Sequence, residues 1–140
     1  MKNISEIFEE FEQRKTKEDR LAVLRYNANW ALRSTLKGVF DPNVQFTITE
    51  VPQYTPSLDP IGLSATSLHQ ELGRFYIFEK NNPKVSPSLT EKRKKEILIQ
   101  MLEALEAKEA KVLEGILTKK LKVKGLTYEI VKEAFPDLVP

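Results

Sequence analysis

Apolar residues recur at intervals of three and four along most of this 140-residue chain. That spacing places them on one face of an α-helix, so each stretch that has it predicts an amphipathic helix. The expected helices begin near residues 4, 16, 30, 67, 88, 108 and 127. The pattern therefore predicts an all-α domain of about six to seven helices that spans residues 1–140.

The fourth of these stretches has the widest apolar surface. It runs from Ser67 to about Lys80, and most of its circumference is apolar, so we expect it to be the central helix. Trp30 opens the third stretch and is expected in the core, because tryptophan buries a large apolar area. Glu109 stands where the fifth stretch should be apolar, which predicts a break or kink near residues 107–108.

Residues 43–51 change the period. Apolar and polar side chains alternate there, which predicts one short extended crossing. Prolines at positions 52, 56 and 60 then exclude regular structure. We expect this loop to be packed against the domain through Tyr54, Leu58, Ile61 and Leu63. It could serve as a functional loop or simply cross over the core.

Composition limits the chemistry. The chain has no cysteine, which excludes disulfides, thiol nucleophiles and Cys-ligated metals. It contains no glycine-rich phosphate loop and no His/Asp/Glu cluster with metal-ligand spacing, and His69 is the only histidine. We therefore expect no enzyme activity, no metal and no cofactor. The acidic N-terminus and the lack of an apolar run near 20 residues indicate a cytoplasmic protein that does not enter membranes.

Positive charge is concentrated in one part of the chain. The net charge is only +2, yet residues 90–125 carry ten basic and six acidic side chains. The basic residues include two tight clusters, Lys92, Arg93, Lys94 and Lys95, and Lys119, Lys120, Lys122 and Lys124. Cations at a helix start oppose the helix dipole, so the first cluster indicates either phosphate contacts or a solvated face.

The second cluster is expected to form a basic elbow between the last two helices. Gly125 turns the backbone, and Thr127 is expected to cap the final helix. The free N–H groups at that helix start and the neighbouring lysines would then meet at one anion site. The alternative is a helical hairpin whose lysines only keep the surface soluble.

The last part of the chain holds a pattern made of Leu121, Gly125, Phe135, Pro136, Leu138, Val139 and Pro140. In this pattern it resembles the end of the N-terminal DNA-binding domain of ATP-dependent DNA ligases, above all the phage T4 type. The resemblance implies a non-catalytic phage protein of DNA replication or repair, in the host cytoplasm, that binds nicked or intact double-stranded DNA. The family's catalytic K-x-D-G motif is missing. Residues that would contact phosphate are Lys120, Lys122, Lys124, Gly125 and Thr127.

A second hypothesis is a protein-interaction adaptor or host-takeover protein that reuses such a fold without binding DNA. Its docking face would be the acidic first helix or the 52–63 loop, and its partner a replication or host protein. Arg25, Arg33 and Lys37 could form a further basic strip, although isolated cations on a helix are usually solvated.

Overall fold

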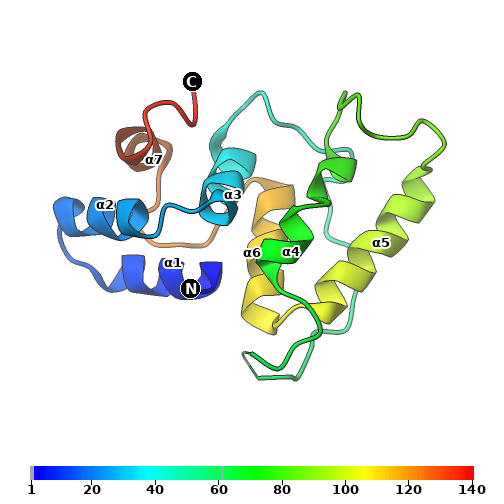
Figure 1. Cartoon of the computed structure of the whole chain (residues 1–140), viewed down its shortest axis with the longest axis horizontal. Coiled ribbons are helices and arrows are strands. Elements are labelled where there is room, and N and C mark those ends of the chain that lie inside the picture. Colours follow the sequence, from blue (N-terminus) through cyan, green and yellow to red (C-terminus); the bar gives the residue numbers. More distant parts are fainter. Residues whose placement is uncertain (1, 61) are drawn as a thin grey trace.

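The computed structural model describes residues 2–60 and 62–140, and within them the chain is all-α (Figure 1). The described residues form seven α-helices and one 3-10 helix, η1. They are α1 (Ile4–Gln13), α2 (Lys17–Tyr26), α3 (Trp30–Phe40), α4 (Leu68–Leu72), η1 (Phe75–Phe78), α5 (Glu91–Ala104), α6 (Ala107–Thr118) and α7 (Tyr128–Ala134). None of the described helices is long and apolar enough to cross a bilayer.

Side-chain caps determine where several helices begin. The hydroxyls of Thr16, Thr90 and Thr127 each accept a backbone N–H at the start of α2, α5 and α7. Each cap satisfies a donor that the helix leaves free. The break between α5 and α6 falls at Leu105–Glu106, slightly before the expected position, because the Glu106 carboxylate caps α6.

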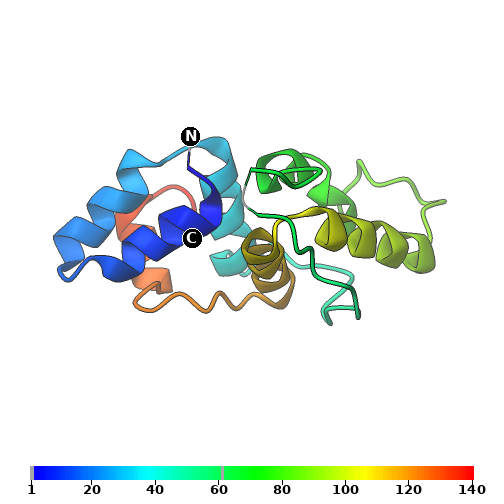
Figure 2. The same cartoon turned by 90° about the horizontal axis from the view of Figure 1, so that it is seen from below.

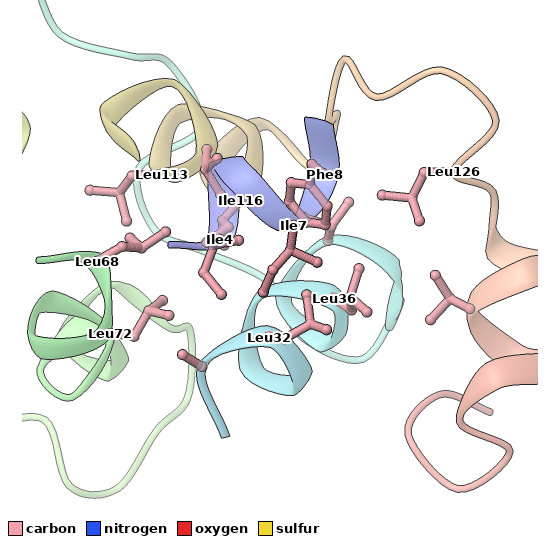
Figure 3. Close-up of a cluster of buried hydrophobic side chains, with 14 of the residues drawn as sticks. Ile4, Ile7, Phe8, Leu32, Leu36, Leu68, Leu72, Leu113, Ile116 and Leu126 are labelled. Atoms are coloured by element: carbon pink, nitrogen blue, oxygen red, sulfur yellow. The ribbon is translucent and has the colours of Figure 1, made fainter. Parts of the chain in front are cut away.

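The helices pack around α6. It contacts α1, α3, α4 and α5, while α7 packs on α2 and α3. Figures 1 and 2 show α1, α2 and α7 in one half of the elongated molecule and α5 extending into the other. Figure 3 shows the core where α1, α3, α4 and α6 meet, with Ile7, Leu36, Leu68 and Ile116 pointing toward one another.

The prediction of one long central helix over residues 67–80 is wrong in both its length and its position. The helix ends at Leu72, and Phe75–Phe78 continue as the 3-10 turn η1. Phe75 then packs edge-on against Phe46, with 5.4 Å between ring centroids. These aromatic contacts replace the third and fourth turns that the apolar pattern predicts, and α6 takes the central position.

The expected extended crossing is present as a single antiparallel bridge between Phe46 and Glu79. The following loop is only partly packed. Tyr54 is half-buried and donates its hydroxyl hydrogen to Glu114, but Leu58 and Leu63 are 98% and 72% exposed. The prediction that these two leucines pack down is wrong, and Ile61 lies outside the described residues.

Candidate nucleic-acid interface

The candidate interface is built on the 119–127 segment, which joins α6 to α7. It is a crossing rather than a tight elbow, and Figures 1 and 2 show it running from α6 past α1 to α7. Leu121 and Val123 are partly buried against the core, whereas Lys120, Lys122 and Lys124 are exposed. Partly buried and exposed side chains thus alternate along this extended stretch, and the three lysines lie on the side that faces solvent.

Lys119 is a correction to the predicted phosphate site. Its ammonium group points inward and donates to the backbone carbonyls of Gly38, Asp41 and Val44, the first two at 2.9 Å. Burial lowers the pKa of this lysine from its ordinary value. In a helix the Gly38 carbonyl would accept from residue 42, which is Pro42 and has no N–H. Lys119 supplies the missing donor and is thus a structural residue.

Gly125 forms the turn before α7, as expected. Its φ is +86°, a conformation that residues with a Cβ rarely adopt. A Cβ there would also overlap the guanidinium group of Arg20, which packs directly on this turn. Arg20 additionally lies 5.4 Å from the Phe11 ring centroid and donates from Nε to the Arg14 carbonyl.

Thr127 caps α7 as predicted, accepting from the Ile130 N–H at 3.3 Å. Its hydroxyl therefore satisfies one of the N–H groups that the sequence had assigned to a phosphate. The helix is also short, with only seven residues. We therefore assign the anion-binding potential of this region to side-chain cations rather than to the helix end.

Carboxylates moderate the charge beside the segment. Glu12 accepts the Lys124 backbone N–H at 2.8 Å, so it lies against the turn. A groove of about 560 Å³ between α1, α6 and the segment is lined by both signs of charge. Two of its lysines are paired, Lys108 with Glu9 at 2.9 Å and Lys111 with Glu114 at 3.4 Å. Lys120 and Lys122 also line the groove, without an ion pair among the described residues.

The basic cluster of residues 92–95 does not adjoin the 119–127 segment. Lys92, Arg93 and Lys95 are exposed at the start of α5, but Lys94 is buried and pairs with Glu91 at 3.1 Å. Figures 1 and 2 place the start of α5 at one end of the long axis and the 119–127 segment in the other half. The prediction that Lys94 contacts phosphate is therefore wrong, and Lys92, Arg93 and Lys95 lie on a different part of the surface from the 119–127 segment.

The local sequence pattern missed Arg20 and misplaced Trp30. Arg20 is 105 positions from Gly125, and nothing in the local pattern indicates their contact. Trp30 is 60% exposed, although its stretch is helical as predicted. Of the residues of the suggested further basic strip, Arg25 of α2 donates to the Glu133 carbonyl and Arg33 of α3 lies over the Phe135 ring, so both arginines contact α7 or its C-terminal end.

Metal binding and the single histidine are the remaining questions of chemistry in the described residues. They hold no group of three or more His, Asp or Glu placed to bind a metal ion. His69 is partly buried, and desolvation lowers its pKa. Its Nε2 is buried and has no hydrogen-bond partner among the described atoms.

Comparison with known families gives one match. Residues 7–123 match a family of unknown function (DUF6433), and no curated protein matches the chain. The matched range includes α2 to α6 and ends at Val123, whereas most residues of the ligase resemblance lie beyond it. Because the match covers well over half of the 140 residues, the chain belongs to this family of unknown function (DUF6433).

Proposed function

We propose that this chain is a non-catalytic module that binds the sugar–phosphate backbone of double-stranded DNA through its 119–127 segment. The observation that carries the proposal is the outward alignment of Lys120, Lys122 and Lys124, alternating with the inward Leu121 and Val123. A cationic row of this kind suits a polyanion better than it suits a small ligand.

The spacing of the row supports a phosphate backbone as its ligand. Alternate residues of an extended segment are about 6.6 Å apart, and flexible lysine side chains can adjust that spacing to neighbouring phosphates. Arg20 adds a fourth cation beside Gly125. Such contacts position a protein on a duplex without reading its sequence.

The same geometry predicts modest affinity. Glu9, Glu12 and Glu114 line the groove beside the lysines and repel phosphates. Weak binding that depends on duplex shape is compatible with an accessory protein of DNA replication or repair. The ligase resemblance suggests that role. Nicked and intact duplexes are both candidate ligands.

Charge reversal tests the proposal. The variant Lys120→Glu/Lys122→Glu/Lys124→Glu should bind a 20-base-pair duplex at least tenfold more weakly than the wild type in fluorescence anisotropy at low salt. The matched control is Lys92→Glu/Arg93→Glu/Lys95→Glu, which makes the same charge change on exposed residues at the far end of the molecule.

The two variants separate a local site from general electrostatics. Loss of binding in the first variant alone supports the proposal. Equal losses in both variants would mean that only net charge matters, and unchanged binding in the first would remove the segment from the interface.

A specific observation favours the alternative of a protein-interaction adaptor. Leu58 and Leu63 are largely exposed on the 52–63 loop, so this loop offers apolar side chains to a partner protein. The nearby Thr55 and Tyr54 tie this loop to α5 and α6 through Glu103 and Glu114. In that function Leu58→Ser/Leu63→Ser would abolish capture of a replication or host protein, while duplex affinity would stay absent in every variant.

A further inference from the structure

A second groove is lined by no residue of the 119–127 segment. It has a volume of about 620 Å³ and shares no lining residue with the groove beside that segment. Its walls come from α3, the end of α4, η1 and the 79–84 turn.

Aromatic side chains dominate this second groove. Trp30 is 60% exposed at its edge, and Tyr76 is 37% exposed. Phe46 and Phe75 line it as well and are held edge-on to each other. Much of the Trp30 indole is exposed at this edge, and a groove of this size accommodates a planar ring against its face.

The charges at this groove favour an anion. Lys37 and Lys84 line it, both exposed, and neither forms an ion pair with a carboxylate among the described residues. Glu79 is the one acid in the lining, and it accepts a hydrogen bond from the Asn82 side-chain amide at 2.8 Å. The occupant should thus combine an aromatic ring with negative charge.

We propose that this groove binds an unpaired segment of single-stranded nucleic acid, with a base stacked on Trp30 and flanking phosphates at Lys37 and Lys84. A duplex hides the faces of its bases, whereas a single strand offers them to aromatic side chains. A free nucleotide has the same chemistry but fewer phosphates. The site rests on its own residues and does not depend on the duplex-binding surface.

The chain provides its own probe, because Trp30 is its only tryptophan. Stacking of a base on an indole quenches its fluorescence. Titration with a ten-nucleotide oligothymidine should therefore quench the Trp30 emission and reach saturation. Thymidine monophosphate should reach the same quenching only at a far higher concentration. Absence of quenching by the oligonucleotide up to 1 mM would overturn the proposal.

Variants locate the binding. In anisotropy with a labelled oligothymidine, Trp30→Ala should weaken binding about tenfold or more. Lys37→Glu/Lys84→Glu should also weaken binding, and its effect on the affinity should be larger at low salt than at high salt. Tyr26→Ala is the matched control, because Tyr26 is 90% exposed yet does not line the groove. Equal affinity in Tyr26→Ala and Trp30→Ala would overturn the proposal.

Two further arms test the location and the occupant of this groove. The variant Lys120→Glu/Lys122→Glu/Lys124→Glu should leave oligothymidine quenching of Trp30 unchanged, even if it abolishes duplex binding. If that variant loses the quenching, the single strand binds at the 119–127 segment, and the proposal of a separate site is wrong. Quenching by an acidic peptide that contains tyrosine, equal to that by the oligonucleotide, would assign the groove to a protein instead.

Discussion

At the scale of single residues, neighbouring lysines have different roles. Lys119 replaces the backbone donor that Pro42 lacks, whereas Lys120 projects into solvent. We expect Lys119→Met to lower the free energy of unfolding by about 2 kcal/mol or more, because three carbonyls lose a charged donor. Lys120→Met should change it by no more than about 0.5 kcal/mol. Urea unfolding measures both.

The same pair also separates stability from binding. Lys120→Met should weaken duplex binding, and Lys119→Met should leave it intact in protein that is still folded. A Lys119→Met variant as stable as the wild type would show that water satisfies the three carbonyls equally well.

Glu109 makes stability depend on pH. It is 3% exposed, its Oε2 accepts from the Ser5 N–H at 2.7 Å, and its Oε1 has no described partner. Burial raises the pKa of this carboxyl from its ordinary value of 4.5. The protonated form is therefore favoured in the folded state, and its stabilising contribution is complete below 4.5 and is lost as pH rises through the raised pKa.

We therefore expect Glu109→Gln to gain stability relative to the wild type as pH increases from 4 to 8, since glutamine cannot ionise. Urea unfolding at several pH values measures the difference. Glu96→Gln is the control, because Glu96 is exposed and should give a profile parallel to the wild type. A parallel profile for Glu109→Gln as well would contradict the argument.

At the scale of elements, the contact between α6 and the 119–127 segment depends on Gly115. Its carbonyl accepts the Lys120 N–H at 2.9 Å. A Cβ on Gly115 would lie 2.6 Å from Leu121 Cδ2 and 3.0 Å from the Lys120 carbonyl oxygen. The side chain could rotate away, but the backbone oxygen can move only if the segment moves.

We expect Gly115→Ala to displace the segment, and thus to lower both the stability and the duplex affinity. Overpacking of this kind costs about 1–3 kcal/mol, which exceeds the roughly 1 kcal/mol that alanine gains over glycine in a helix. Thermal unfolding and anisotropy measure the two effects. Adding Leu121→Ala should restore only part of the loss. If Gly115→Ala is more stable than the wild type, the 119–127 segment can move away from the added Cβ without a loss of stability.

At the scale of the whole molecule, charge is divided between distant surfaces. The net charge is only +2, and the cations at the start of α5 lie far from the 119–127 segment. The full set of basic residues therefore does not act on one stretch of duplex. A footprint confined to Lys120, Lys122 and Lys124 has a definite consequence for the salt dependence of binding.

Each phosphate neutralised on duplex DNA contributes about −0.9 to the slope of log K against log salt concentration. Three lysines predict a slope of about −2.7, and Arg20 would bring it to about −3.6. Between 50 and 200 mM salt the affinity should fall roughly fortyfold for three contacts and roughly 150-fold for four. A slope near zero would exclude a phosphate footprint, and one steeper than about −6 would require the cations of α5.

Local sequence patterns were enough to predict the helices and most of their starting points, because periodicity and caps act within a few residues. They also identified Gly125 and Thr127 correctly as a turn and a cap. Packing between distant parts of the chain turns Lys119 inward, leaves Trp30 exposed and sets the cations of α5 apart. Those outcomes depend on contacts such as that of Lys119 with the end of α3, and no local pattern encodes them.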